Sequence, residues 1–327
     1  MKHIHFDPDS DSSSTPAPVA DIESLLARRR RSEEPRPKWP TWAEKARAAE
    51  LFAPETPDAG AFSPTLNARK AERLWLSKEL GPFHQREVIA DVVERIRAGK
   101  EATVYLCTTP AGSARERIAA KVYHPISRRT NANKQLYQLG RDVLDSEGRP
   151  VLARDWRMQK AIAQSSGAGR EASQASWLQH EYARLEQMHR AGGDVPEPLM
   201  HGGHVLLMEF VGDAAGAAPI LANVVLEPGE AKPAFERILW NVELLLSFGW
   251  VHGDLSPHNV LYQDGRPRLI DFPQVVAAEQ NPQAFALFVR DLERVSSYFA
   301  RFGLGPDPRR LAEELWKKHV LETAPEV

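Results

Sequence analysis

The segment from Val251 to Pro273 carries the residues whose types and spacing best suit chemistry. Asp254 and Asn259 lie in V-H-G-D-L-S-P-H-N-V-L-Y, and Asp271 lies in L-I-D-F-P-Q. Transfer of a γ-phosphoryl group needs one carboxylate that faces the acceptor hydroxyl, and hard oxygen ligands for a metal ion that neutralises phosphate charge. Asp254 suits the first role, and Asn259 and Asp271 suit the second.

A structural explanation of the same residues is that Asp254 and Asn259 cap turns while Asp264-Gly265 closes a hairpin. Asp and Asn are common in turns, so each residue alone is ambiguous. Taken together, with apolar strands between them, they favour the chemical interpretation.

A second candidate lies upstream, where Lys121 stands in the apolar strand A-A-K-V-Y. A lysine buried without a partner is costly. Binding of nucleotide phosphates supplies a reason, and Glu181 on the next long helix can hold the ammonium group in place. The alternatives are a lysine that snorkels from an edge strand and a solvated Glu181; we favour the pairing.

Before that strand, A-G-K-E-A-T-V-Y contains one glycine, Gly99, where a phosphate-covering loop would stand. It does not match G-x-x-x-x-G-K-[ST], because Gly99-Lys100 is followed by Glu101. Its position before the Lys121 strand is its only support.

Strands, helices and hairpins must position these residues. We predict an amphipathic helix, or a helix leading into a strand, over 84–97, and a strand over 204–210. A β-hairpin is expected over 102–123 and another over 260–270. The further predicted helices span 173–190, 235–248, 284–302 and 308–321.

Composition narrows the class of protein. The chain has 327 residues with 42 Lys+Arg against 44 Asp+Glu, which argues against a general nucleic-acid coat. Its single cysteine fits a reducing compartment. The longest apolar-rich run, 238–251, is too short to span a bilayer, so we expect a soluble, cytoplasmic protein without a membrane partner. Arginine outnumbers lysine, which suggests a GC-rich bacterial genome.

Five motifs in order, covering roughly residues 84–303, resemble the RIO-type atypical serine/threonine protein kinases. They are G-K-E-A-T-V-Y, A-A-K-V-Y, V-L-L-M-E-F-V-G, V-H-G-D-L-S-P-H-N-V-L-Y and L-I-D-F-P-Q. The G-K-E-A and H-G-D-L-S stretches favour the first main branch of that family.

The resemblance implies an α+β fold: a trimmed, two-lobed protein-kinase-like architecture with a small β-rich N-lobe and a helical C-lobe. We predict a mostly disordered extension over 1–82, with a short helical piece around 68–79. The N-lobe follows over 83–208 with a long insertion at 124–172, then the C-lobe over 209–305 and a C-terminal helix and tail over 306–327.

The resemblance also implies ATP and Mg²⁺ as cofactors and assigns roles to matching positions. The implied catalytic residues are Asp254, Asp271 and Lys121, and the implied metal ligands are Asn259 and Asp271. The implied nucleotide-binding set also includes Glu181, a covering loop, two residues of the adenine slot and three beside the adenine edge. These are Gly99, Lys100, Glu101 and Ala102; Val104 and Ala119; and Met208 with the backbones of Glu209 and Val211.

Family members carry an autophosphorylated loop where the insertion lies, which makes Ser165 and Ser166 candidate phosphosites. They also form an aspartyl-phosphate at the position of Asp271, so ATPase cycling is expected beside phosphorylation of a protein acceptor or of the chain itself. S-P-H-N stands where Ser-Glu-Tyr-Asn or a similar run is usual, which puts acceptor choice in question.

Two other functions fit part of the pattern. A small-molecule phosphotransferase of the aminoglycoside or choline type shares H-G-D and I-D-F, but Pro273-Gln274 and the G-K-E-A loop argue against it. A nucleotide-sensing scaffold with vestigial chemistry is the other. In archaea and eukaryotes the family matures the small ribosomal subunit, so a ribosomal-subunit component is an implied partner, against which the bacterial composition weighs.

Overall fold

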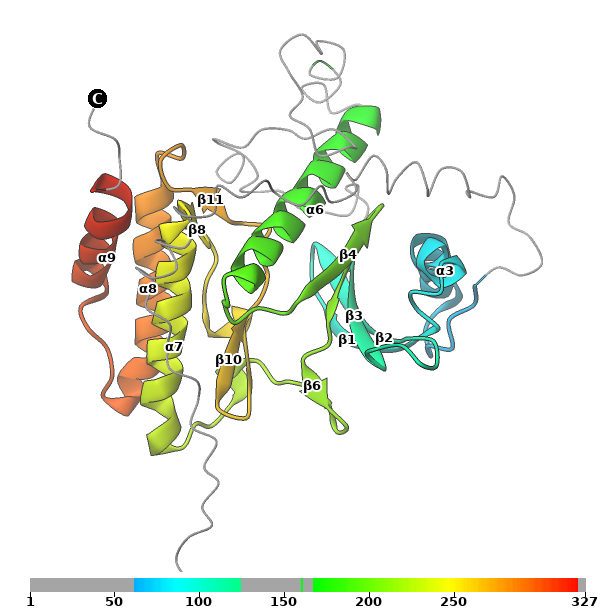
Figure 1. Ribbon diagram of the computed structural model, residues 1–327, viewed down its shortest axis with the longest axis horizontal. Coiled ribbons are helices and arrows are strands. Elements are labelled where there is room, and N and C mark those ends of the chain that lie inside the picture. The colour runs from blue at the N-terminus through cyan, green and yellow to red at the C-terminus, as the bar shows by residue number, and fades with distance from the viewer. Residues whose placement is uncertain (1–61, 125–159, 161–166, 323–327) are drawn as a thin grey trace, which may run out of the picture. The chain divides into compact units, whose positions relative to one another are not determined.

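The computed structural model describes residues 62–124, 160 and 167–322, all within one compact unit, Pro35–Val327 (Figure 1). Most of the predicted extension and of the 124–172 insertion, with Ser165 and Ser166, therefore lies outside the described residues. The expected α+β arrangement is confirmed, because a β-rich N-terminal part is followed by a helical C-terminal part.

The N-terminal part is built on one antiparallel sheet in the order β1-β2-β3-β5-β4. Its strands are β1 (Asp91–Ala98), β2 (Ala102–Thr108), β3 (Arg117–Tyr123), β4 (Pro198–Gly202) and β5 (Val205–Glu209). The predicted strands of the first hairpin are confirmed. For 84–97 the second alternative holds, since a helix ends at Gln85 and the chain enters β1 at Asp91.

Residues 62–85 cover one face of this sheet, although most of them fall in the extension predicted to be disordered. Leu76, Leu80 and Phe83 of α3 (Lys70–Gln85) recur at helical spacing and are buried. They pack with Phe62 and Leu66 against one face of the sheet. The residues of that face include Tyr105, Cys107, Ile118, Ala120, Val122, Val205 and Leu207. The ordered lobe therefore begins well before the predicted boundary at 83.

The packing of α3 predicts a strong effect of truncating its buried side. Leu80 is fully buried, so Leu80→Ala should lower the free energy of unfolding by about 2–5 kcal/mol. Leu74 on the same helix is 62% exposed, and Leu74→Ala should change it by no more than about 0.5 kcal/mol. Denaturant unfolding measures both. Equal changes in the free energy of unfolding for Leu80→Ala and Leu74→Ala would mean that α3 does not pack on the sheet.

The opposite face of the sheet and the helical part hold the candidate site. Helix α6 (Gly167–Arg190) lies between β3 and β4 in the chain and contacts β4 and β5. In the helical part, α8 packs against α9 and α7 contacts both β8 and β10. These elements are α7 (Pro228–Ser247), β8 (Trp250–Val251), α8 (Ala284–Phe299) and α9 (Pro308–Trp316), all visible in Figure 1.

Two short antiparallel pairs connect these helices. Strand β9 (Val260–Gln263) pairs with β10 (Arg266–Leu269) around Asp264-Gly265, whose positive φ angles of 49° and 74° suit the tight turn. Strand β8 pairs with β11 (Val276–Ala277). The predicted second hairpin is thus confirmed. The β8–β11 pair holds together the two ends of the segment that carries Asp254 and Asp271, and the β9–β10 hairpin lies between these two residues.

The remaining elements close the helical part. They are β6 (Gly212–Asp213), β7 (Gly216–Ala217) and the short helices η2 (Leu221–Asn223), η3 (Pro257–Asn259), η4 (Ala300–Phe302) and η5 (Lys317–Leu321). His319 of η5 is buried and hydrogen-bonds Glu243 of α7 at 2.8 Å, which ties the C-terminal helix to the body. Among the described helices, none combines the length and apolar character needed to cross a membrane.

Candidate active site

Strand β3 directs Lys121 away from the core covered by α3 and toward α6. Successive side chains of a strand alternate between faces, so Lys121 points opposite to Ala120 and Val122. Lys121 Nζ donates to Glu181 Oε1 at 2.6 Å and to Asp271 Oδ1 at 2.7 Å. Three segments distant in sequence therefore meet at one ammonium group, and the predicted pairing of Lys121 with Glu181 is confirmed.

The charges of Lys121 and Asp271 each stabilise the ionised form of the other. Burial would lower the pKa of Lys121, but the carboxylates of Asp271 and Glu181 raise it well above its ordinary value. Burial likewise would raise the pKa of Asp271, but Lys121 holds it below its ordinary value. Lys121 is therefore a cation and Asp271 an anion at neutral pH. The side chain of Asp271 is 41% exposed while that of Glu181 is 1% exposed, so only Asp271 is accessible from solvent.

His252 braces the loop that carries Asp254. Its ring is buried; Nδ1 lies 3.4 Å from the backbone N of Asp254, and Nε2 lies 3.2 Å from the carbonyl oxygen of Ile270. Only the neutral tautomer with hydrogen on Nε2 accepts the first bond and donates the second. Burial lowers the pKa of His252, in agreement with this geometry.

The neutral state of His252 predicts a loss of stability in acid. Because its pKa is lowered in the folded chain, the unfolded chain binds the proton first as pH falls below about 6.5. This contribution to stability is present above that pH and is lost below it, at no more than about 1.4 kcal/mol per pH unit. Urea unfolding from pH 8 to 5 should show a smaller acid loss in His252→Gln. The exposed His258→Gln should behave like the unchanged chain, and identical profiles for all three would refute the neutral assignment.

Asn259 joins the same loop to Asp254. Its Nδ2 donates to the backbone oxygen of Asp254 at 2.8 Å and lies 3.4 Å from Asp254 Oδ2. Both contacts use the amide nitrogen, so they leave the amide oxygen for a metal ion. The N–H of Ile270 donates to the carbonyl of Asn259 at 3.0 Å, which sets the loop beside the segment of Asp271.

Asp271 itself adopts a backbone conformation with φ of 69°. A positive φ is uncommon outside glycine and is better tolerated by Asp and Asn than by most residues. Unusual backbone conformations persist where the surroundings over-determine them, and they cluster at functional sites. Here the contact with Lys121 supplies one such determinant.

Asp291 of α8 anchors the loop that carries Asp254, and it was not among the residues predicted from the sequence. Its Oδ2 accepts the N–H of Gly253 at 2.7 Å, and burial raises its pKa to about 7. Arg290 donates to the carbonyl oxygen of Gly253. Asp291 lies in the apolar stripe of α8 with Leu287, Phe288, Leu292 and Val295, and an acid within such a stripe is the signal that could have found it.

The predicted phosphate-covering loop is a tight turn between β1 and β2. The N–H of Gly99 donates to the carbonyl of Ala102 at 2.9 Å, and a Cβ on Gly99 would lie 3.0 Å from that oxygen. A side chain there would require the backbone to move, so glycine suits the position. Lys100 is exposed, and Glu101 is partly exposed.

The residues predicted to surround an adenine lie on neighbouring strands. Ala119 pairs with Met208 across β3 and β5, and Val104 pairs with Lys121 across β2 and β3. The N–H of Glu209 donates to the carbonyl of Glu197, and the carbonyl of Val211 accepts from Ala218. This leaves the carbonyl of Glu209 and the N–H of Val211 as the groups suited to bond an adenine edge.

The donor set fits Mg²⁺ shared with a nucleotide. In the described part of the chain no three His, Cys, Asp or Glu side chains gather to hold a metal by themselves. Mg²⁺ is usually bound by one or two carboxylates together with substrate phosphates. The oxygens of Asn259 and Asp271 are of the kind that such a site needs, and their role as metal ligands stays a prediction.

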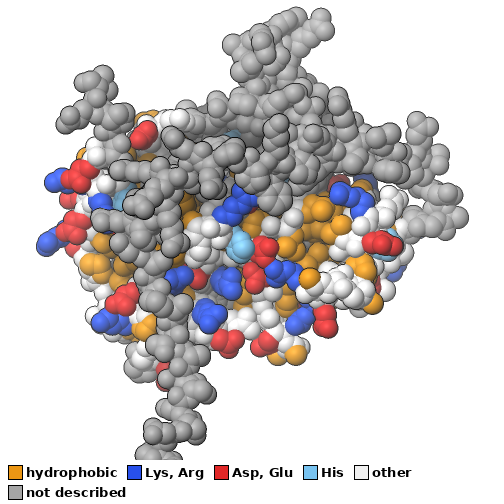
Figure 2. Space-filling model, in the orientation of Figure 1, with side chains coloured by type: hydrophobic (Ala, Val, Ile, Leu, Met, Phe, Trp, Pro, Cys, Tyr) orange, Lys and Arg blue, Asp and Glu red, His pale blue; other side chains and the backbone are white. Residues whose placement is uncertain are grey.

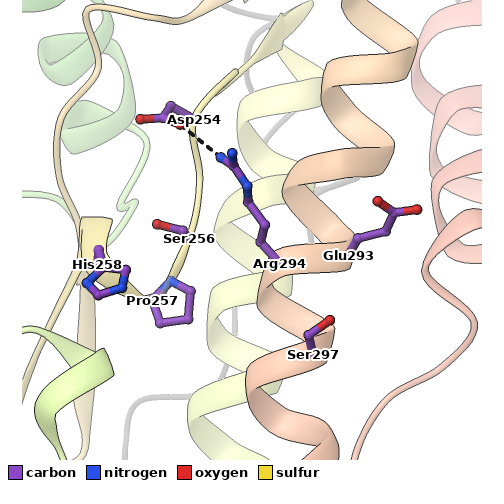
Figure 3. A pocket seen from close by; sticks show the side chains of 7 residues that line it. All are labelled: Asp254, Ser256, Pro257, His258, Glu293, Arg294 and Ser297. Carbon is purple, nitrogen blue, oxygen red and sulfur yellow. Dashed lines mark hydrogen bonds and ion pairs between the residues drawn. The ribbon is translucent and has the colours of Figure 1, made fainter.

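A cavity of about 560 Å³ adjoins Asp254 on the side of α8 (Figure 3). Arg294 of α8 points across it, and its Nη1 lies 2.9 Å from Asp254 Oδ1. Arg294 was not among the site residues predicted from the sequence. The cavity is lined by Asp254, Ser256, Pro257, His258, Glu293, Arg294 and Ser297.

The sequence of this chain is similar to the sequences of several known proteins. The chain is 35% identical over 131 residues to the serine/threonine-protein kinase rio1 of Schizosaccharomyces pombe, a match covering 39% of this chain and 26% of that protein. It is 31% identical over 218 residues to the RIO-type serine/threonine-protein kinase Rio1 of Haloferax volcanii, covering 67% of this chain and 66% of that protein. The matched region thus spans between about a quarter and two thirds of these relatives.

A solved structure and a family model complete the comparison. The Rio2 kinase-ADP/Mg²⁺-phosphoaspartate complex from Chaetomium thermophilum superposes with a TM-score of 0.50 at 19% identity, covering 90% of this chain and 84% of that one. At that identity the likeness concerns the fold. The RIO domain model matches residues 111–311, more than half of the chain, and the protein therefore belongs to the RIO domain family.

Proposed function

We propose that this chain is an ATP- and Mg²⁺-dependent RIO-type serine/threonine kinase that phosphorylates a protein acceptor or itself, with ATPase cycling as an accompanying activity. The observation that carries the proposal is the placement of Lys121 Nζ between Glu181 and Asp271. The relatives named as serine/threonine kinases support it.

In this proposal Glu181 keeps Lys121 charged and oriented, and Lys121 binds nucleotide phosphates. Asn259 and Asp271 hold Mg²⁺, which when bound neutralises phosphate charge. The covering turn at Gly99 and the carbonyl of Glu209 with the N–H of Val211 bind the rest of the nucleotide. Lys121 contacts both Glu181 and Asp271, and Asn259 contacts Asp254, so these residues hold one another in position.

Asp254 accepts or orients the proton of the acceptor hydroxyl. Its side chain is 43% exposed, so an acceptor can reach it from the cavity. Its backbone position is held by the buried ring of His252, by Asn259 and, through Gly253, by Asp291. A base held this firmly loses little orientational freedom when the acceptor arrives.

We also propose that Asp271 receives a phosphoryl group during ATPase cycling. The solved Rio2 complex is a phosphoaspartate complex, which supports the idea for a related fold. Asp271 is the anionic member of the Lys121 cluster that is open to solvent, and Lys121 can neutralise the charge that such a modification adds. Asp254, which is paired with Arg294, keeps the role of accepting or orienting the proton of the acceptor hydroxyl.

Removal of Mg²⁺ gives the direct test. Purified protein with Mg²⁺ and γ-labelled ATP should yield labelled protein or free phosphate, chelation with EDTA should stop both, and added Mg²⁺ should restore them. Hydroxylamine releases phosphate from a carboxylate but leaves phosphoserine intact, so label that it removes lies on a carboxylate, as the proposal for Asp271 requires. Neither product from folded protein with Mg²⁺ would contradict the proposal and favour a nucleotide-sensing scaffold.

A cytoplasmic location and a ribosomal-subunit component as partner are also proposed, on the family resemblance. Acidic and basic side chains are interspersed on the face in Figure 2, which supports selective contacts over general nucleic-acid coating. Affinity capture from the native host tests the partner: small-subunit components enriched with the full chain, and lost with an unrelated control protein, would support it.

A further inference from the structure

The cavity beside Asp254 has two chemically different walls. The catalytic-loop wall contributes the hydroxyl of Ser256, the ring of Pro257 and the imidazole of His258, and no carboxylate besides Asp254. The α8 wall contributes Glu293, Arg294 and Ser297. Figure 3 shows Arg294 reaching toward Asp254, while Glu293 points away from the loop. The guanidinium is therefore the charged group that faces an acceptor approaching Asp254.

Arg294 is held by a contact that is easily exchanged. The ion pair with Asp254 joins side chains that are 40% and 43% exposed. Pairs at such exposure contribute about 0–1 kcal/mol, so a competing anion can replace Asp254 at little cost. A guanidinium carries five N–H donors, and one nitrogen, Nη1, makes the described contact. Arg294 thus has the capacity to bind a second carboxylate.

A further cation lies at the edge of the same loop. Arg97 of β1 is exposed, and its Nη1 donates to the carbonyl oxygen of His258 at 3.0 Å. The charged residues that line the cavity are Asp254, Arg294 and Glu293, of which Glu293 points away from the loop in Figure 3, while Arg97 adds a positive charge just outside the lining. An acceptor segment that brings its own carboxylate meets a complementary charge here.

Arg294 also competes with the acceptor. During transfer the acceptor oxygen bonds the γ-phosphorus, the bond to the β-phosphate oxygen breaks to release ADP, and the acceptor proton passes to Asp254. The hydroxyl must therefore approach a carboxylate already engaged by Arg294. A carboxylate next to the hydroxyl gives Arg294 another partner and frees Asp254 in the same event.

We propose that this cavity is the acceptor site and that Arg294 determines its specificity, selecting a serine or threonine flanked by an acidic side chain. The inference rests on the proposed kinase function and names its substrate class. A volume of about 560 Å³ lies within the roughly 300–1,000 Å³ range of ligand pockets and can hold several side chains of an extended segment.

Two synthetic peptides test this: a short peptide with a central serine followed by two glutamates, and the same peptide with glutamines. The unchanged protein should phosphorylate the glutamate peptide with a kcat/KM about 5-fold higher, the scale of a partly exposed ion pair. Arg294→Ala should abolish that ratio, and Arg294→Lys should retain part of it because the charge is kept. Arg309→Ala, which removes an exposed arginine of α9, should leave the ratio unchanged.

Binding of the same fluorescent peptides without ATP separates this inference from the kinase proposal. A glutamate preference in binding that is lost in Arg294→Ala supports the acceptor site even if no phosphate is transferred, in which case the kinase proposal alone fails. ATP turnover without a glutamate preference in transfer or in binding overturns the acceptor assignment alone. A preference for the glutamate peptide that survives in Arg294→Ala also overturns the role of Arg294. The absence of both binding and transfer for either peptide overturns it as well.

Discussion

Replacing Asp254 with asparagine is expected to lower the rate of phosphoryl transfer by about 10²–10⁴-fold, the range for a positioned proton-transfer group. Asparagine keeps the size of the side chain but cannot take up the acceptor proton. The fold should be unaffected, because the ion pair that the change removes is exposed and contributes about 0–1 kcal/mol. Initial rates with labelled ATP, measured beside an unfolding curve, report both quantities.

Asp264→Asn is the matched control for that experiment. Asp264 lies in the exposed turn between β9 and β10 with a positive φ, which asparagine also tolerates. The same chemical change there should leave rate and stability as they were. A rate in Asp254→Asn within a few-fold of the unchanged protein would remove Asp254 from the proton-transfer role.

Replacing Lys121 with methionine is expected to have a large effect on stability as well as on turnover. The Glu181 carboxylate is 1% exposed, and loss of its cation leaves a buried charge whose other described partner is the neutral hydroxyl of Tyr123. Breaking a buried pair from one side costs about 3–5 kcal/mol in the free energy of unfolding. ATP turnover should fall to background because the phosphate-binding cation is gone. Exposed Lys78→Met on α3 is the control and should change neither quantity.

The double variant Lys121→Met/Glu181→Gln separates the two effects. With a neutral amide in place of the carboxylate, most of the lost stability should return, while turnover should stay at background. Guanidinium unfolding of the single and double variants forms a double-mutant cycle. If the double variant were as unstable as Lys121→Met, the instability would come from lost packing and the charge argument would be wrong.

The sequence predicted the Lys121–Glu181 pair and pointed to the loop of Asp254 and Asn259 as a candidate site because these residues lie within recognisable local patterns. A lysine in an apolar strand demands a partner, and a long helix that follows offers one. Arg294 and Asp291 escaped because no motif in the sequence links α8 to the loop that they contact. Arginine on a helix with one exposed face is ordinarily solvated. The place of Asp291 in an apolar stripe signals burial, but only the three-dimensional arrangement shows which loop the two residues face.

The sequence did not predict that residues 62–82 fold onto the sheet, and the reason lies in their composition. Proline punctuation and the scarcity of β-branched residues across the first 80 residues favoured an extension without a core. The spacing of Leu76, Leu80 and Phe83 already indicated one apolar helical face. What no local pattern could show is that the sheet formed by later strands presents a matching apolar face.

That arrangement has a consequence for how the chain acquires its structure as it is synthesised. Leu80 of α3 leaves the ribosome well before Leu207 of β5, yet the two pack in one core, and Leu207 is made only after the whole 124–172 segment. At about 5–20 residues per second, the apolar side of α3 waits on the order of 10 s for its partner strand. During that interval the nascent chain exposes a hydrophobic helix, and chaperones that recognise such surfaces have their opportunity to bind there.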